Sequence, residues 1–413
     1  MKSLTILVKN TSELDFLIPL IDDLNTSSHT VFFSSLFVDS VIEKNSFYYK
    51  HLVKNNVNIK SYINLIKFKT LKSLLCNFKN IFINSNKKKS NYIIHKGINF
   101  LEKFIIKNFC EFDILDITLP KIIFYPNRND KKFLHKKELQ DYLRSYDNKI
   151  IFVPHGPHYN QKNSLFFTFN SKFQKNYNYW LSFSKDKIWE KYKKNLTCFS
   201  KIGYPMFDKK WIDKIERIER KNEKHLGVIT RQFYTVNQKI NPNEMTLPYD
   251  EFFRFMKEVK KVSDYDKNIK LLIKPHPSTN LRELKKILIK LNINNYELNF
   301  DPIFIFERKI FASVSVLSTS FLYLYLKLKP VFFYESESSR QHLESWPLLK
   351  KIYINSFAVD KIENIHKKYK DYLNMDDAEK KIKLQFIKKN LEKYYRSNPI
   401  LRAKNKINVL IKR

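Results

Sequence analysis

The chain has 413 residues, a length that favours two domains over one. Its hydrophobic content of 43% is enough to build real cores, which excludes an intrinsically disordered protein. The 76 Lys and Arg residues exceed the 41 Asp and Glu residues and give a formal net charge of +35, which favours a polyanionic partner.

Short apolar runs rich in Ile, Phe and Val alternate with longer helical patterns along the first half of the chain. The runs predict strands at residues 4–8, 30–35, 80–84, 121–126 and 149–154. Amphipathic patterns between them predict helices at residues 12–24, 62–79, 91–108 and 130–145.

The same alternation continues in the second half. Strands are predicted at residues 179–183, 226–230, 270–275, 312–317, 330–335 and 351–356. Helical patterns occupy residues 185–194, 249–262, 279–292, 320–328, 359–371 and 376–396.

Apolar strands that alternate with helices indicate parallel sheets covered on both faces. The chain is therefore predicted to be α/β, with two Rossmann-like domains whose parallel sheets face each other across a cleft. We expect an N-terminal domain over 1–165, a C-terminal domain over 166–375, and a C-terminal helix in 376–413 that packs back on the N-terminal domain. Ligands of such sheets bind beyond the C-terminal ends of the strands, so the residues that follow each strand are the candidates for chemistry.

The cysteines and the apolar segments indicate the compartment. Cys76, Cys110 and Cys198 are scattered without a CxxC pair, which indicates a reducing compartment and neither a disulfide framework nor a zinc site. The apolar run at the start is too short for a signal peptide, and no window reaches the length of a membrane span. The sequence thus predicts a cytoplasmic protein, with peripheral attachment to the inner membrane as the open alternative.

Glycine is scarce, and its positions are informative. The four glycines are Gly97, Gly156, Gly203 and Gly227. Neither GxGxxG nor GxxxxGK[ST] occurs, which argues against ordinary dinucleotide enzymes and P-loop NTPases. A phosphate would therefore be held by N–H groups at a helix start, by hydroxyl groups and by fixed cations.

The first candidate site is the stretch LLIKPHPSTN, residues 271–280. His276 stands between Pro275 and Pro277, which restrict the backbone on both sides, so its ring can bind a phosphate oxygen with little entropy loss. Lys274 adds positive charge, and Ser278 or Thr279 is expected to cap the following helix. The structural alternative is a histidine that only completes a strand-to-helix turn.

The second candidate is a run of three hydroxyl residues, Ser318, Thr319 and Ser320, between a buried strand and an apolar helix. The free N–H groups and hydroxyls at such a helix start form a cradle for an anion. Simple helix capping, which needs one hydroxyl, is the alternative.

The third candidate is His155, which follows a strand directly and is followed by Gly156, where a ligand can approach closely. We predict His155 as a general base, since its pKa ordinarily lies near neutrality. A turn histidine without a catalytic role is an equally open interpretation. His155 and His158 have metal-ligand spacing, but no third ligand lies nearby, so no metal is predicted.

Two further strand ends carry candidates. Gly203 and Pro205 fix a turn in KIGYPMFD, where Asp208 is expected to cap a helix and Gly203 to let the backbone approach a base or sugar. Arg231 is a candidate cation for a diphosphate or carboxylate. The DxD at 264–266 precedes a strand, which is the wrong edge for catalysis.

The ordered set of motifs resembles glycosyltransferases of the GT-B type, and within them bacterial enzymes that use cytidine-activated donors. The sialyltransferase and polysialyltransferase families carry an HP motif and a later Ser/Thr pair, which match His276-Pro277 and the hydroxyls of Ser318–Ser320. In those families both motifs hold CMP. Their acidic base motif has no counterpart here.

The CDP-glycerol glycerophosphotransferase family resembles the chain over more positions, within about residues 150–340. Its HG, GxPxxD, HP and KPxxFY motifs match His155-Gly156, Gly203–Asp208, His276-Pro277 and Lys329–Tyr334. An acid that normally precedes the paired serines is absent, since Val316-Leu317 stand there.

The resemblance implies an inverting, metal-independent transferase of capsule or lipopolysaccharide synthesis that needs no cofactor. A CMP- or CDP-linked sugar, such as a sialic-acid-like residue, would bind to the C-terminal domain and a glycan or glycolipid acceptor to the N-terminal domain. His155 and His276 would be catalytic, and Gly156, Gly203, Arg231, Lys274, Pro277, Ser318, Thr319 and Ser320 would bind nucleotide or phosphate.

Three alternatives stay open: a CDP-glycerol or ribitol type polyol-phosphate transferase, a nucleotide-sugar epimerase or hydrolase on the same scaffold, and a basic nucleic-acid-binding protein. The last is disfavoured because aromatic residues lie mostly within predicted strands and helices instead of between surface lysines. The positive charge instead favours an anionic membrane surface as a further partner.

Overall fold

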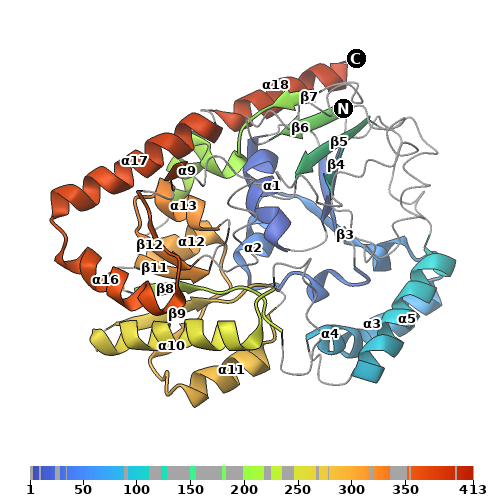
Figure 1. Ribbon diagram of the computed structural model, residues 1–413. Coiled ribbons are helices and arrows are strands. Elements are labelled where there is room, and N and C mark those ends of the chain that lie inside the picture. Colours follow the sequence, from blue (N-terminus) through green and yellow to red (C-terminus); the bar gives the residue numbers. More distant parts are fainter. Residues whose placement is uncertain are drawn as a thin grey trace. The chain divides into compact units, whose positions relative to one another are not determined.

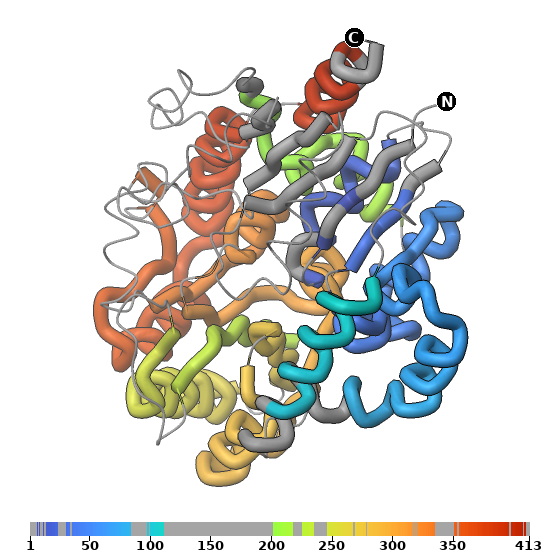
Figure 2. Tube along the Cα trace, turned by 90° about the vertical axis from the view of Figure 1, so that its right-hand side faces the viewer, coloured from blue at the N-terminus to red at the C-terminus, as the bar shows by residue number. Residues whose placement is uncertain are grey.

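The computed structural model describes residues 3–8, 11–23, 28–33, 35–87, 92–110, 122–127, 149–154, 179–182, 199–217, 225–234, 246–266, 269–277, 279–316, 318, 320–334, 351–352, 355–395 and 398–412. These residues form two compact units (Figures 1 and 2). Unit 1 lies within 1–205 and 398–412, and unit 2 within 206–397.

Unit 1 contains a parallel sheet whose described strands have the order β3-β2-β1-β4-β5-β6-β7. These strands are β1 (Ser3–Val8), β2 (Ser28–Phe33), β3 (Asn58–Ser61), β4 (Ile122–Asn127), β5 (Lys149–Pro154), β6 (Tyr179–Ser182) and β7 (Phe199–Lys201). The α-helices described in unit 1 are α1 (Thr11–Asp23), α2 (Phe47–Lys54), α3 (Lys69–Asn77), α4 (Lys79–Lys87), α5 (Tyr92–Phe109) and α18 (Pro399–Lys412). Buried side chains of β1 and β2, including Val8 and Phe32, form its core with Leu14 and Leu17 of α1.

Unit 2 contains a second parallel sheet, of order β10-β9-β8-β11-β12-β13. Its strands are β8 (His225–Ile229), β9 (Lys270–Lys274), β10 (Tyr296–Leu298), β11 (Ile310–Val316), β12 (Val331–Tyr334) and β13 (Phe357–Val359). Numbered within the unit, this is the 3-2-1-4-5-6 order of the Rossmann fold, whose direction of winding reverses between β8 and β11. Among the described residues, the α-helices that unit 2 contains include α9 (Lys209–Glu216), α10 (Tyr249–Tyr265), α11 (Leu281–Lys290), α12 (Ile303–Phe306), α13 (Ser320–Leu326), α16 (Ile365–Asn374) and α17 (Asp377–Tyr395).

The centre of the second sheet is tightly packed. All residues of β8 are buried, and a Cβ added to Gly227 would lie 2.8 Å from the Cδ1 atom of Ile310 and 3.1 Å from the ring of Phe306. Gly227 therefore permits a close approach to the segment that leads from α12 into β11.

The α/β prediction with two parallel sheets is confirmed. Two strand predictions are wrong. Residues 80–84 lie inside α4, where Phe82 is buried beside Phe37 with ring centroids 5.8 Å apart, because a short apolar run does not distinguish a strand from a helix. Residues 351–352 are helical, and the strand predicted at 351–356 begins only at Phe357.

The division of the chain also differs from the predicted boundary at residue 165. Strand β6 pairs with β5, and β7 with β6, so the first sheet extends to Lys201. Residues 376–413 form two helices instead of one: α17 belongs to unit 2, and α18 to unit 1. In unit 1, Lys404 of α18 lies 3.6 Å from the Asp23 carboxylate at the end of α1.

Candidate functional site

The candidate site is the edge of the second sheet at which β8, β9 and β11 end. Ile229 of β8 pairs with Lys274 of β9 and with Ser315 of β11. Because all three strands are parallel and neighbours lie about 4.8 Å apart, β9 and β11 are separated by about 10 Å, with β8 between them. The segments that follow them leave the sheet at one edge, and the reversal of winding between β8 and β11 is where α/β proteins of this order bind ligands.

The segment after β9 is a fixed turn that leads into α11. The Thr230 N–H donates to the Lys274 carbonyl oxygen at 3.1 Å, and the Thr279 N–H donates to the His276 carbonyl oxygen at 2.8 Å. The side chains of His276 and Pro277 are exposed. The structure thus places His276 on a hydrogen-bonded turn, with its ring accessible to a ligand.

The cap of α11 is Asn280, whose Oδ1 atom accepts from Arg282 N at 3.1 Å and from Glu283 N at 3.3 Å. The cap predicted at Ser278 or Thr279 is therefore wrong, because the helix begins two residues later than the sequence pattern indicated. This leaves the Thr279 hydroxyl without the capping role.

Two buried hydroxyls lie at this edge. Thr230 is 3% exposed and Thr279 is 9% exposed, and neither Oγ1 atom has a hydrogen-bond partner among the described residues. A buried hydroxyl without a partner costs about 1–3 kcal/mol, so both groups have hydrogen-bonding capacity that a ligand at the edge can use. No sequence motif marks Thr230, and its position at the end of the strand predicted over 226–230 is the one signal that the sequence offers for it.

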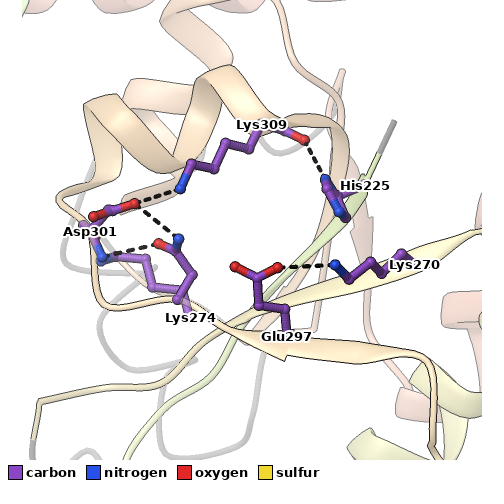
Figure 3. A network of polar contacts seen from close by, with 7 residues as sticks. His225, Lys270, Lys274, Glu297, Asp301 and Lys309 are labelled. Atoms are coloured by element: carbon purple, nitrogen blue, oxygen red, sulfur yellow. Dashed lines mark hydrogen bonds and ion pairs between the residues drawn. The ribbon is translucent and has the colours of Figure 1, made fainter. Parts of the chain in front are cut away.

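Lys274 takes part in the network shown in Figure 3. Its Nζ atom donates to the main-chain oxygen of Asp301, which follows β10. The Asp301 carboxylate accepts from Lys309 Nζ at 2.7 Å and from Asn299 Nδ2 at 3.0 Å. Burial raises the pKa of Asp301, but the hydrogen bonds from Lys309 and Asn299 and the charges of both lysines outweigh it, so this pKa lies below its ordinary value. Lys274 therefore fixes a loop beside the site, and its predicted contact with a phosphate stays a prediction.

The segment after β8 is held by its neighbours. Leu247 N donates to the Gln232 carbonyl oxygen at 3.0 Å, and Tyr234 N donates to the Leu247 carbonyl oxygen at 2.9 Å. The ring of Phe233 stacks on Phe252 with centroids 4.0 Å apart. These contacts fix the backbone of Arg231, whose half-buried side chain begins at the same edge as His276.

The segment after β11 begins α13. Ser320 N lies 3.4 Å from the Ser318 hydroxyl oxygen, which accepts its hydrogen bond, so Ser318 caps this helix. Both serines are half-buried. Capping is thus observed, and contact of these hydroxyls with a phosphate stays a prediction.

The remaining predicted residues lie elsewhere. Gly203 follows β7 in unit 1 and has a positive φ of 96°, which fits the tight turn expected there. Asp208 caps α9 by accepting from Lys210 N at 2.9 Å, as predicted. His155, Gly156, Ser278 and Thr319 lie outside the described residues.

Within the described ranges, no group of three or more His, Cys, Asp or Glu side chains is arranged to hold a metal ion. Asp264 of the DxD forms an ion pair with Lys260, which lies four residues earlier in α10. None of the described helices has the length and apolar character needed to cross a bilayer.

No family model matches the chain, and no curated protein matches it. Solved structures do share its fold. The S. aureus MnaA structure with UDP has a TM-score of 0.53 at 13% identity and covers 99% of this chain and 96% of its own. The Methanocaldococcus jannaschii UDP-GlcNAc 2-epimerase in complex with UDP-GlcNAc and UDP has a TM-score of 0.51 at 10% identity, with 100% of both chains covered.

A variant of the wall teichoic acid polymerase TagF has a TM-score of 0.50 at 10% identity and covers 100% of this chain and 88% of its own. Identities this low show a shared fold and nothing further about function. The chain therefore has the α/β architecture with parallel sheets of GT-B enzymes.

Proposed function

We propose that the chain is a metal-independent transferase that builds a bacterial surface polysaccharide and binds a nucleotide-activated donor at the β8–β9–β11 edge of unit 2. One observation carries this proposal. The paired ends of β8 and β9 and the turns that follow them bring the exposed His276 and the backbone of Arg231 to one edge of a Rossmann sheet. The buried hydroxyls of Thr230 and Thr279, which have no hydrogen-bond partner among the described residues, lie in the same turns.

The proposed donor site contacts the phosphate through side chains. His276 donates a ring N–H to a phosphate oxygen, and Arg231 supplies a fixed positive charge. Ser318 and Ser320 contribute hydroxyls from the neighbouring strand end, while Lys274 adds its charge through the loop that it holds. These groups stabilise the negative charge that collects on the nucleotide as its bond to the transferred group breaks.

The acceptor hydroxyl must lose a proton as it attacks. We assign the removal of this proton to His155 as general base. The acceptor, a glycan or glycolipid, is assigned to unit 1. The attacking oxygen forms a bond to the anomeric carbon, the donor's bond to the phosphate oxygen breaks, and the nucleotide leaves with the electron pair. Attack from the side opposite the leaving group inverts the anomeric configuration.

The donor base is proposed to be cytidine on the strength of the motif resemblance. Support for a nucleotide in general comes from the fold, because the MnaA and M. jannaschii structures with a similar fold contain UDP. Isothermal titration with CMP, CDP, UDP and GDP, repeated with His276→Ala, tests the proposal. We expect one nucleotide to bind and the variant to weaken it by about tenfold or more, the usual size for a charge-assisted hydrogen bond. Absence of binding by all four nucleotides contradicts the donor site.

A nucleotide-sugar epimerase is the second candidate, favoured by two structures of the same fold that are UDP-GlcNAc 2-epimerases. Product analysis separates the two activities. An epimerase changes UDP-GlcNAc without any acceptor, whereas a transferase releases nucleotide only when acceptor is present. A polyol-phosphate transferase is recognised by transfer of phosphorus to the acceptor together with release of CMP.

A further inference from the structure

Three consecutive helices of unit 1 present apolar side chains to solvent. Helices α3, α4 and α5 lie side by side, as Figures 1 and 2 show, and an antiparallel bridge between Ile66 and Cys110 closes the segment at its ends. The exposed fractions are 53% for Phe68, 53% for Leu74, 49% for Phe78, 54% for Ile81, 71% for Phe100, 44% for Leu101 and 49% for Phe104. We name these seven residues the α3–α5 face.

The apolar surface of this face is additional to the one that α5 uses for packing. Ile105 and Ile106 are buried in unit 1, whereas Phe100 and Phe104 point to the opposite side of the same helix. Since 100° separates successive residues, Phe100, Leu101 and Phe104 share one side. The helix therefore has one apolar side for the core and a second one that nothing in the described residues covers.

Aromatic contacts join α3 and α5 into one surface. The ring of Phe109 lies 6.1 Å from that of Phe68 at the start of α3 and 6.0 Å from that of Phe104, measured between centroids. The exposed rings are thus held in place by the fold of unit 1 and are not on independent loops.

The charge around this face is predominantly positive, and Lys79 of α4 forms an ion pair with Asp39. Residues 67–110 contain ten lysines and one acidic residue, Glu102. Glu102 is 4% exposed and accepts a hydrogen bond from Leu36 N at 2.8 Å, so it does not offset the lysines at the surface. Lys103 and Lys107 are exposed on α5, one turn apart, and flank the side that carries Phe100 and Phe104.

We propose that the α3–α5 face docks the protein on the surface of an anionic bilayer. Phenylalanine and leucine enter the boundary between headgroups and acyl chains, and flanking lysines contact the lipid phosphates, which is the pattern of interfacial helices. A second copy of the chain fits less well, because two-fold pairing of this face brings lysines of both copies together. Nucleic acid also fits less well, because Leu74, Ile81 and Leu101 offer no ring for a base to stack on. The α3–α5 face belongs to unit 1 and shares no residue with the proposed donor site of unit 2.

Co-sedimentation with vesicles tests the proposal. We expect the full chain to bind vesicles that contain about one-third phosphatidylglycerol in phosphatidylcholine, more weakly at high salt, and to bind pure phosphatidylcholine at least about tenfold less. Phe100→Ser with Phe104→Ser, and separately Lys103→Glu with Lys107→Glu, should each lower binding to the anionic vesicles by about tenfold or more.

Matched variants outside the face serve as controls. Ile289→Ser with Ile382→Ser removes side chains that are 72% and 66% exposed on α11 and α17, and Lys381→Glu with Lys389→Glu makes the same charge change on α17. Both control pairs should bind the anionic vesicles like the parent chain. Thermal unfolding verifies that every variant is folded.

Four results overturn the proposal. The first is that the folded parent chain does not bind anionic vesicles, and the second is that the control variants lose as much binding as the face variants. The third is that the Phe100→Ser and Phe104→Ser pair converts a dimer into a monomer without any effect on vesicle binding. The fourth is that the Lys103→Glu and Lys107→Glu pair loses oligonucleotide binding while its vesicle binding is unchanged.

Discussion

Lys274 donates a hydrogen bond from its Nζ atom to the main-chain oxygen of Asp301, which joins the end of β9 to the loop after β10. The lysine that the sequence offers as a phosphate ligand is therefore also a structural residue. Its partner loop is held a second time by the contact between Asp301 and Lys309, at 2.7 Å. Charged contacts thus fix the edge of the sheet beside the proposed donor site. The stability of this edge therefore depends on the protonation state of the Asp301 carboxylate.

Replacing Asp301 by Asn should make the protein less sensitive to acid. The pKa of Asp301 lies below its ordinary value of 3.8, so the carboxylate contributes stability above that pH and loses it as the pH falls through the folded-state pKa. Because the group is partly exposed, solvent screening limits the loss in Asp301→Asn at neutral pH to about 1 kcal/mol. Urea unfolding between about pH 7 and pH 2 should show a smaller pH dependence in the variant than in the parent chain.

Asp264→Asn is the control for this measurement, because Asp264 forms an exposed ion pair with Lys260 within one helix. Such pairs contribute little, and we expect a change below about 0.5 kcal/mol. Equal pH profiles for Asp301→Asn and the parent chain contradict the assigned role of the carboxylate.

Replacing Thr230 or Thr279 by Val should stabilise the ligand-free protein and weaken nucleotide binding. Valine has the shape of threonine but lacks the hydroxyl that has no partner among the described residues, so removing it should gain up to about 1 kcal/mol of unfolding free energy. If the hydroxyls bind the donor, the affinity for the preferred nucleotide falls about fivefold or more. Thermal unfolding and isothermal titration measure the two effects.

Ser35→Ala should behave in the opposite way, since its hydroxyl donates to the Phe37 carbonyl oxygen at 2.7 Å in unit 1. We expect a loss of about 1 kcal/mol and an unchanged nucleotide affinity. Unaltered affinity in both threonine variants excludes these hydroxyls from the donor site.

The sequence predicts the buried strands better than the edge strands. Continuous apolar runs identify β8, β9, β11 and β12, since both faces of a central parallel strand are covered. Strand β10 contains only Tyr296–Leu298 at the sheet edge, and its half-exposed residues carry no such signal. Strand β3 escapes prediction for the same reason.

The candidate site is predictable in part from the sequence. His276 can be placed at a strand end because the apolar pattern that predicts the strand and the prolines that predict the turn are both local signals. The contact between Lys274 and Asp301 joins residues that are far apart in the chain, so no local pattern reveals it. Likewise, packing around the sheet decides that the Thr230 hydroxyl has no hydrogen-bond partner within the part of the chain that the structure describes.

Replacing Gly227 by Ala should destabilise unit 2 at its centre. The added methyl group meets the terminal Cδ1 atom of Ile310 at 2.8 Å and the Phe306 ring at 3.1 Å, so both side chains have to shift within a packed core. Overpacking of this kind costs about 1–3 kcal/mol. Gly97→Ala is the matched control, because no atom lies within 4 Å of its added Cβ and the residue lies inside α5. Denaturant unfolding should show a gain of about 0.5–1 kcal/mol for Gly97→Ala; equal effects of the two substitutions contradict the close approach at β8.

Replacing Glu102 by Gln should stabilise the protein in mildly alkaline solution. Burial raises the pKa of Glu102 above its ordinary value of 4.5, although the hydrogen bond from Leu36 N lowers it in part. A raised carboxyl pKa contributes stability below pH 4.5, and this contribution is lost as the pH rises through the folded-state pKa. Glutamine keeps the oxygen that accepts from Leu36 and carries no charge, so its unfolding free energy should exceed that of the parent chain at about pH 8, by about 1.4 kcal/mol for each unit of pKa shift. Chemical denaturation at several pH values measures this difference, and Glu363→Gln, at an exposed carboxylate, is the control. If Glu102→Gln is less stable than the parent chain at alkaline pH, the protein stabilises the buried charge of Glu102 more than its single hydrogen bond indicates.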